Sequence, residues 1–309
     1  MNTINALKKY TAFPKKTVSA VLILATLTAA VYFFDKHRNL LTSLKHVPLY
    51  VTAEVFGLYI LMLGVLIGIF QATMYLYGKR LKLKENSLIN CYSLFMNFFI
   101  PGQTGVAFRA YYMKKNYHLK YLDYTLATII YYLTYAVISI IFILAGSQPY
   151  YLTLPIVLAV IAIAVLGIKT YLRKNQETRL KLTLKSFSYL VFITLTQVVL
   201  QTIIYMIEIH SVKHGVRFSQ VVTYAGTANL ALFVSLTPGA IGIRESFLIL
   251  SEKLNHLSSS TIVLANVVDR SVYIAFLLIL GVVIALLKVR DRLGVLNKTI
   301  VSNTDSDKF

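Results

Sequence analysis

The sequence predicts an all-α integral membrane protein, and three features of composition and pattern support this fold class. Hydrophobic residues make up 57% of the 309 positions and charged residues only 14%, whereas a soluble domain carries about 25% charged residues. Several apolar stretches approach the ~20 residues that cross a bilayer core of about 30 Å. Basic residues, which give a formal net charge of +19, flank these stretches. They therefore indicate topology and contact with anionic lipid rather than nucleic-acid binding.

Six of the apolar stretches are long enough to be full transmembrane helices. They cover residues 18–34, 50–77, 121–145, 151–168, 187–209 and 261–287. The first follows two lysines, as the apolar core of a signal peptide does, but no clear A-x-A cleavage site comes after it. We therefore expect it to remain as the first helix of the chain.

The distribution of Lys and Arg between the spans predicts the topology. The N-terminal segment, the connections at 79–84 and 169–186, and the tail are rich in both residues, whereas the connection at 146–150 has neither. Loops rich in Lys and Arg stay in the cytoplasm. The sequence therefore predicts a multi-pass protein of a bacterial or archaeal cytoplasmic (inner) membrane, with both termini in the cytoplasm.

Two further apolar segments, 86–100 and 221–236, do not fit this alternation. Each leads into a P-G-x-x-G motif, and these residues interrupt helices because Pro lacks a backbone donor and Gly accepts unusual dihedral angles. The residues expected at the two breaks are Pro101, Gly102, Gly105, Pro238, Gly239 and Gly242. We predict two re-entrant hairpins, one from each face. The alternative is eight conventional crossings, two of them short.

Each half of the chain then consists of two spans, a hairpin and a third span. The second half begins from the opposite face of the membrane, which is the pattern of an inverted repeat. We expect one transmembrane domain over residues 1–309, with repeat halves at 18–145 and 151–287 and a polar cytoplasmic tail at 288–309. Irregular backbone at membrane depth needs protein or water around it. The two breaks therefore predict an internal polar cavity.

Three arginines in or beside the apolar segments are candidates for substrate binding. A charge in the hydrocarbon layer costs about 3 kcal/mol or more, and the Arg fork can bind phosphate oxygens bidentately. The candidate substrate-binding residues are Arg109, Arg244, Arg270, Glu245, Asn97 and Asn229. Two alternatives stay open. The first is that Arg109 and Arg244 each extend to the nearest interface instead of binding substrate. The second is that Arg270 forms a structural ion pair, preferably with Glu245.

Other polar side chains inside the spans have both a structural and a functional interpretation. Glu208 and Asp269 are the other acids considered as partners of Arg270. Gln197 and Gln201 share a helix face because they are four residues apart. They either line a path for a headgroup or form hydrogen bonds between helices.

The sequence predicts no catalytic, metal or cofactor site. The one cysteine, Cys91, excludes an internal disulfide and a cysteine-based metal site, and the histidines form no H-x-x-x-H pair. An intramembrane glycosyltransferase would need positioned acids and, for a nucleotide-sugar donor, usually a metal, but the loops contain no D-x-D. A cation channel is disfavoured because the candidate residues are themselves cationic.

Around the two breaks the chain reads NFFIPGQTGVAFRAYYM and LTPGAIGIRESFLIL. These stretches resemble the signature regions of the lysylphosphatidylglycerol synthetase transmembrane-region family, with patterns of approximately N-x-x-x-P-x-x-x-G-x-x-x-R and P-G-x-I-G-x-R-E. Arg270 corresponds to a later arginine of the family, and the resemblance covers nearly the whole chain. The chain departs from the family at residues 130–133, which read IYYL where an acidic–basic pair is common.

The resemblance implies a stand-alone member without the aminoacyl-transferase domain, similar to the flippase half of multiple-peptide-resistance proteins. We expect a lipid transporter that handles an anionic phospholipid or glycolipid headgroup and has no enzymatic activity. The alternative is a non-transporting accessory protein in envelope glycolipid or polysaccharide assembly, with proteins of that pathway as partners. Membrane lipid, and not nucleic acid, is the expected ligand.

Overall fold

A computed structural model describes residues 48–99, 103–146, 183–231, 252–255 and 257–306, together with residues 155 and 180, and the side chains of the last helix as far as residue 284. Every extended element in this part of the chain is an α-helix. The predicted spans at 18–34 and 151–168 lie outside the described residues. The all-α fold class is confirmed.

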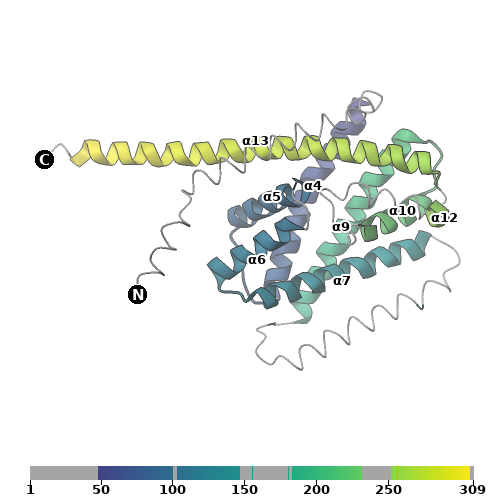
Figure 1. Ribbon diagram of the computed structural model, residues 1–309, viewed down its shortest axis with the longest axis horizontal. Coiled ribbons are helices and arrows are strands. Elements are labelled where there is room, and N and C mark those ends of the chain that lie inside the picture. The colour runs from purple at the N-terminus through teal and green to yellow at the C-terminus, as the bar shows by residue number, and fades with distance from the viewer. Residues whose placement is uncertain are drawn as a thin grey trace, which may run out of the picture. The chain divides into compact units, whose positions relative to one another are not determined.

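The described helices follow one another as Figure 1 shows. They are α4 (Leu49–Tyr75), α5 (Leu83–Phe99), α6 (Thr104–Tyr117), α7 (Tyr121–Gly146), α9 (Leu184–Val212), α10 (Phe218–Ala231), α12 (Glu252–Asn255) and α13 (Ser259–Ser306). Helices α4, α7, α9 and the Ser259–Ile284 part of α13 are long and apolar enough to cross a membrane. They match the predicted spans at 50–77, 121–145, 187–209 and 261–287. The predicted polar tail is helical as far as Ser306.

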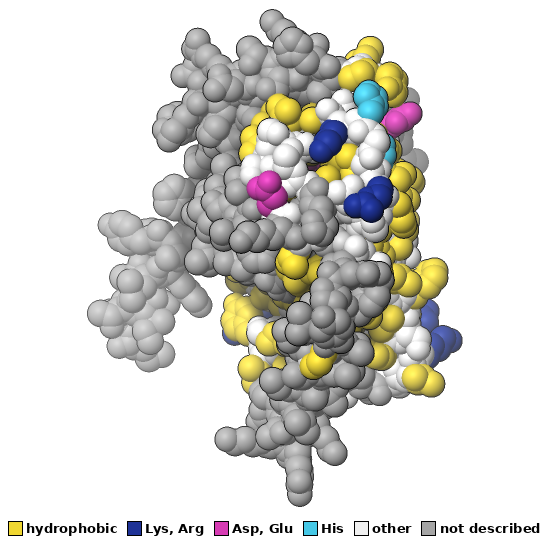
Figure 2. Space-filling view, turned by 90° about the vertical axis from the view of Figure 1, so that its right-hand side faces the viewer, with side chains coloured by type: hydrophobic (Ala, Val, Ile, Leu, Met, Phe, Trp, Pro, Cys, Tyr) yellow, Lys and Arg dark blue, Asp and Glu magenta, His cyan; other side chains and the backbone are white. Residues whose placement is uncertain are grey.

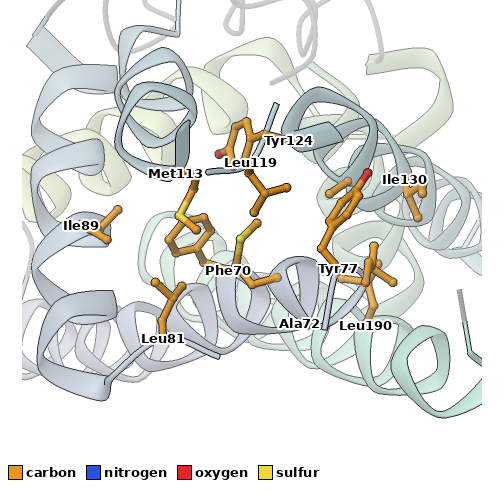
Figure 3. Close-up of a cluster of buried hydrophobic side chains, with 13 residues drawn as sticks. Phe70, Ala72, Tyr77, Leu81, Ile89, Met113, Leu119, Tyr124, Ile130 and Leu190 are labelled. Atoms are coloured by element: carbon orange, nitrogen blue, oxygen red, sulfur yellow. The ribbon is translucent and has the colours of Figure 1, made fainter. Parts of the chain in front are cut away.

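Helices α4 and α9 pack along each other and are joined to the other helices by a buried cluster. Gly68 of α4 allows close approach, because a Cβ atom there would lie 3.1 Å from the side chain of Ile193 in α9. Near the end of α4, the rings of Tyr75 and Tyr189 lie 5.9 Å apart. Phe70 and Met113 pack at the centre of the cluster, which draws on α4, α5, α6, α7 and α9 (Figure 3).

Helices α5 and α6 form a hairpin whose two ends lie together. Glu85 in the first turn of α5 accepts hydrogen bonds from Tyr112 and Tyr117 near the end of α6, each at 2.7 Å. The helices have 17 and 14 residues, fewer than the ~20 that cross a bilayer core. The chain thus returns to the end of the bundle from which α5 starts, as the predicted first hairpin requires.

Helix α10 runs antiparallel to α7 at very short range. A Cβ atom on Gly146, at the end of α7, would meet the Ser219 carbonyl oxygen at 2.4 Å; one on Gly226 would meet the Ser139 carbonyl oxygen at 2.6 Å. Helix α10 therefore begins at the end of the bundle where α7 finishes, opposite to the start of α5 (Figure 1). Leu257, just before α13, packs in one cluster with residues at the start of α10. The chain has therefore returned to this end.

Large apolar side chains cover the outside of the spanning helices. Ile60 and Leu61 of α4, Phe192 of α9, and Ile279 and Val282 of α13 are all more than half exposed. Figure 2 views the end where α10 begins; among the described residues visible there, Lys and Arg side chains lie apart from one another, and hydrophobic side chains continue along the flank. This apolar surface is what a bilayer requires of the faces that contact lipid tails.

Candidate functional site

The break between α5 and α6 is held by the side chain of Asn97. Its Oδ1 accepts a hydrogen bond from the Gly105 backbone N–H at 2.8 Å, and Thr104 donates from its hydroxyl to the Met96 carbonyl at 2.9 Å. Gln103, with a φ of 52°, starts α6 from the left-handed region. Asn97 was predicted to contact substrate. In the structure it satisfies an otherwise unpaired N–H at the start of a helix, a structural task.

One face of α5 carries a line of polar side chains at helical spacing. Asn86, Asn90, Ser93 and Asn97 follow one another at intervals of four, three and four residues, and the first three are buried. Asn86 donates to the Ile67 carbonyl of α4 at 3.0 Å, and Asn90 donates to Asn86 Oδ1 at 2.6 Å. The buried Ser93 accepts from Arg109. The hairpin thus presents its polar face to the inside of the bundle.

Arg109 points into the bundle rather than out to the nearest interface. Its Nε donates to Ser93 Oγ at 2.9 Å, and its guanidinium carbon lies 5.2 Å from the centre of the Phe70 ring on α4. The hydroxyl groups of Tyr124 and Tyr132 on α7 lie within its electrostatic range. The alternative in which Arg109 extends to the interface is therefore wrong, because its side chain is held from three neighbouring helices.

The contacts of Arg109 among the described residues are all to neutral groups. Ser93 provides a hydroxyl, Phe70 the face of a ring, and Tyr124 a phenol. In the described part of the chain no carboxylate contacts this guanidinium. An arginine in a membrane interior normally pairs with an acid or lines a wet cavity. Arg109 therefore retains a positive charge that an anionic ligand can neutralise.

The open end of the α5–α6 hairpin is fastened by Glu85. Both of its carboxylate oxygens accept tyrosine hydroxyls, from Tyr112 and Tyr117. Burial, and after it the hydrogen bond to Glu85, raises the pKa of each of these tyrosines to about 12. Exposed lysines surround this end of the hairpin, and Lys114 places its ammonium 4.2 Å from the centre of the Tyr121 ring. This end has the charge expected of a surface in contact with anionic headgroups.

A second polar centre lies where α4, α9 and α13 meet. Tyr59 of α4 donates its hydroxyl to Asp269 Oδ1 of α13, and Glu208 of α9 also acts electrostatically on Tyr59. Glu208, Asp269 and Arg270 are 1%, 4% and 8% exposed. Arg270 lies eleven positions after the first residue of α13, or about 16 Å at 1.5 Å per residue. It is thus deep in the bundle, as predicted.

The remaining predicted residues are placed as follows. Asn229 is fully buried on α10, and neither amide atom has a hydrogen-bond partner among the described residues. Gln197 accepts a hydrogen bond from Tyr131 of α7 at 3.0 Å, which is the bond between helices considered for it. Gly105 is buried. Seven predicted residues lie outside the described part of the chain: Pro101, Gly102, Pro238, Gly239, Gly242, Arg244 and Glu245.

Sequence reasoning missed Ser93, Phe70, Tyr59 and Glu85. The spacing of Ser93 relative to the three asparagines of α5 is a signal that could have identified it, because four polar residues on one face of an apolar helix indicate a buried polar surface. Phe70 and Tyr59 have no such signal. They lie in an apolar span and gain a role only through partners 39 and 210 residues away.

Long apolar helices, two segments that return to their own end, and an arginine held inside the bundle define a multi-pass helical membrane protein. The chain belongs to the lysylphosphatidylglycerol synthase TM region family, whose model matches residues 17–281. A comparison with curated proteins finds no match. The family membership supports a role connected with membrane lipid.

Proposed function

We propose that this protein is a lipid transporter that moves an anionic phospholipid or glycolipid headgroup across the cytoplasmic membrane, with both of its termini in the cytoplasm. The observation that carries the proposal is the set of neutral contacts around Arg109. A guanidinium in a poorly hydrated interior binds phosphate strongly, because the charge is screened less than in water. The headgroup would occupy this site while the acyl chains stay in the bilayer.

The two oppositely placed segments support movement of the headgroup rather than binding alone. The α5–α6 hairpin carries Arg109 and starts at one end of the bundle, while α10 starts at the other end. In transporters with inverted repeats, elements of this kind open the central site to one face at a time. Arg244 and Glu245 follow the second break in the sequence, and we propose that they serve the headgroup from the other side.

The test is transport of a fluorescent anionic phospholipid in proteoliposomes that contain the purified protein. We expect Arg109→Ala to lose transport and Arg109→Lys to lose most of it, because Lys keeps the charge but not the Nε–H bond to Ser93 or the planar fork. Arg80→Ala is the matched control, because Arg80 is an exposed arginine that contacts the Tyr75 ring at 5.7 Å. Transport by folded Arg109→Ala at the rate of the wild type would contradict the proposal.

Native mass spectrometry of the protein with lipid from its host would separate transport from the accessory role. Retention of a specific lipid by the wild type, and its loss in Arg109→Ala, supports the site whichever role is correct. If the wild type retains such a lipid but gives no transport in proteoliposomes, the accessory protein in glycolipid assembly becomes the better interpretation.

A further inference from the structure

A row of polar side chains lies beyond Arg109, in the interface between α7 and α9. Tyr131 of α7 donates its hydroxyl to Gln197 Oε1 of α9 at 3.0 Å. Gln201 lies one turn further along α9, on the same helix face as Gln197. All three side chains are half-buried. Tyr131, Gln197 and Gln201 are called the amide–tyrosine row below, and the phosphate contact proposed for Arg109 does not use them.

The two glutamines lie on the inward face of α9. They belong to one row with Leu190 and Ile204, at intervals of seven, four and three residues, and both of these apolar side chains are 0% exposed. The exposed side chains of this helix segment lie on the opposite face, at Phe192, Val199 and Ile203. Gln197 and Gln201 nevertheless keep accessible surface. Accessible surface on an inward face indicates space between the helices beside the two amides.

Tyr131 occupies a similar position on the inward face of α7. Ala127 and Tyr135, one turn before and one turn after it, are buried, whereas Tyr131 itself keeps accessible surface. The centre of the Tyr131 ring lies 5.1 Å from that of Tyr132 and 6.1 Å from that of Tyr135. Because these contacts hold the ring, its hydroxyl has a defined position beside Gln197.

The amide–tyrosine row begins close enough to Arg109 for one ligand to reach both. The Arg109 guanidinium lies over the ring of Phe70, and this ring packs edge-on against Tyr124 of α7 at 6.4 Å (Figure 3). Arg109 acts electrostatically on Tyr124 and also on Tyr131. Tyr131 follows Tyr124 by seven residues, about 10 Å along α7. A lipid phosphate held by Arg109 can therefore extend the group attached to it toward Tyr131.

The hydrogen bond between Tyr131 and Gln197 leaves both side chains able to bind a ligand. The bond uses the amide oxygen of Gln197, and no acceptor among the described residues takes its two amide N–H groups. The Tyr131 oxygen retains lone pairs that accept from a ligand hydroxyl. The amide of Gln201 forms no hydrogen bond with the described residues. Neutral donors and acceptors side by side match hydroxyl groups, because each hydroxyl both donates and accepts.

We propose that the amide–tyrosine row makes the lipid site selective for headgroups whose phosphate is esterified to a polyol, either open-chain glycerol or a ring such as a sugar. This inference rests on the proposed function, in which Arg109 binds the lipid phosphate. Tyr131 and Gln197 bind the hydroxyl groups beyond that phosphate. Gln201 binds them next as the headgroup moves toward the end of the bundle where α9 meets the start of α10.

The selectivity has a physical cause in the amide groups. A headgroup without hydroxyls leaves the N–H groups of Gln197 without an acceptor in a poorly hydrated interior. Leaving a buried donor unpaired costs binding free energy, and a site built to bind a hydroxyl therefore rejects an analogue that lacks it. Tyr131 and Gln197 thus act as specificity-determining residues, whereas Arg109 supplies the attraction to the phosphate that all anionic phospholipids share.

The first test compares three lipids of equal charge by native mass spectrometry of the purified protein. Phosphatidylglycerol and phosphatidylinositol carry an open-chain and a cyclic polyol on the phosphate, whereas phosphatidylethanol carries an ethyl group without a hydroxyl. We expect the wild type to bind one polyol lipid roughly threefold to tenfold more tightly than phosphatidylethanol. The polyol lipid bound more tightly identifies the kind of polyol. If neither binds more tightly than phosphatidylethanol, the proposal is overturned.

Two variants test the residues themselves. Tyr131→Phe and Gln197→Met remove hydrogen-bonding groups with little change of volume. Each should remove most of the preference for the polyol lipid and leave the affinity for phosphatidylethanol unchanged. Tyr121→Phe is the matched control, because Tyr121 is an exposed tyrosine at the start of the same helix. A lower unfolding temperature of both variants with an unchanged lipid preference would show that the bond only joins α7 to α9, and would overturn the proposal.

Transport of the same three lipids in proteoliposomes separates this inference from the proposed function. Faster wild-type transport of the polyol lipid than of phosphatidylethanol, with the difference lost in Tyr131→Phe, supports both. Absence of transport for every lipid while the binding preference persists overturns the transport function and leaves the selectivity standing. Equal binding of all three lipids by the wild type, lost for all three in Arg109→Ala, leaves the phosphate site standing and overturns the selectivity.

Discussion

Ser93 of α5 and Arg109 of α6 are joined by a 2.9 Å hydrogen bond across the helix break, from Nε of the arginine to the hydroxyl oxygen of the serine. The serine in turn donates to the Ile89 carbonyl at 2.7 Å. Because the hydroxyl proton is committed to Ile89, the lone pairs of Ser93 are oriented toward Arg109. This contact fixes the direction of the guanidinium. The sequence alone predicts only that a break separates the two helices of this hairpin.

Ser93→Ala should weaken headgroup binding while keeping the charge of Arg109. A hydrogen bond to a charged group contributes about 1.5–3 kcal/mol, so we expect a loss of affinity of roughly tenfold or more. Lipid retention in native mass spectrometry, titrated with an anionic phospholipid, measures this loss. Ser87→Ala is the control, because Ser87 only donates to the Leu83 carbonyl of its own helix. Equal retention by both variants would show that Ser93 does not position Arg109.

Gly105→Ala should destabilise the hairpin. The added Cβ would lie 2.3 Å from the Ser93 carbonyl oxygen and 2.6 Å from Asn97 Oδ1, and backbone cannot move aside as a flexible side chain can. Overpacking of this kind costs about 1–3 kcal/mol, so we expect a lower unfolding temperature in detergent. Gly64→Ala should match or exceed wild-type stability, since nothing lies within 4 Å of the new atom. An unchanged unfolding temperature for Gly105→Ala would contradict the close packing.

Gly226→Ala should separate α10 from α7. Its Cβ would meet both the Ser139 carbonyl oxygen and the side chain of Ile143 at 2.6 Å, and small residues are what permit helices to approach this closely in a membrane. In a titration with denaturing detergent, we expect Gly226→Ala to unfold at a lower detergent fraction than the wild type does. Gly57→Ala, with no neighbour within 4 Å, should unfold where the wild type does. If Gly57→Ala unfolded at a lower detergent fraction than Gly226→Ala, the close packing of α10 against α7 would be refuted.

Glu85→Gln should loosen the open end of the α5–α6 hairpin and change its response to alkaline pH. The pKa of Tyr112 and of Tyr117, about 12 in the folded protein, lies above the value of about 10 for an unfolded tyrosine. Neutral tyrosines therefore stabilise the fold fully below about pH 10, and this contribution is lost as the pH rises through about 12.

Tyrosinate absorbance, recorded during alkaline titration, measures this effect. In Glu85→Gln the tyrosines that ionise last should do so at lower pH than in wild type, because the carboxylate no longer opposes their ionisation. Glu54→Gln, a change of the same chemistry at an exposed position on α4, should leave the titration unaltered. Identical curves for wild type and Glu85→Gln would mean that the two tyrosines do not depend on this carboxylate.

Much of the architecture could be predicted from local pattern. Residues 121–145 were predicted as a span and α7 covers Tyr121–Gly146; the first break was predicted at the P-G-x-x-G motif, and α5 ends at Phe99 before α6 begins at Thr104. Both predictions depend on the length of apolar runs and on the backbone properties of Pro and Gly. Asn97 was predicted to contact substrate, and this stays a prediction; the structure shows that its Oδ1 accepts a hydrogen bond from the backbone N–H of Gly105, eight residues further along the chain.

The sequence by itself determined that this chain enters a membrane as helices, where the first hairpin breaks, and which family it belongs to. These features depend on apolar runs and on Pro and Gly positions, which can be read along a continuous stretch of chain. Only the tertiary structure decided that Arg109 turns inward to Ser93 and Phe70, and that Asp269 meets Tyr59. The partners in these contacts are 16, 39 and 210 residues apart. Their meeting depends on how whole helices pack, and no local pattern records that packing.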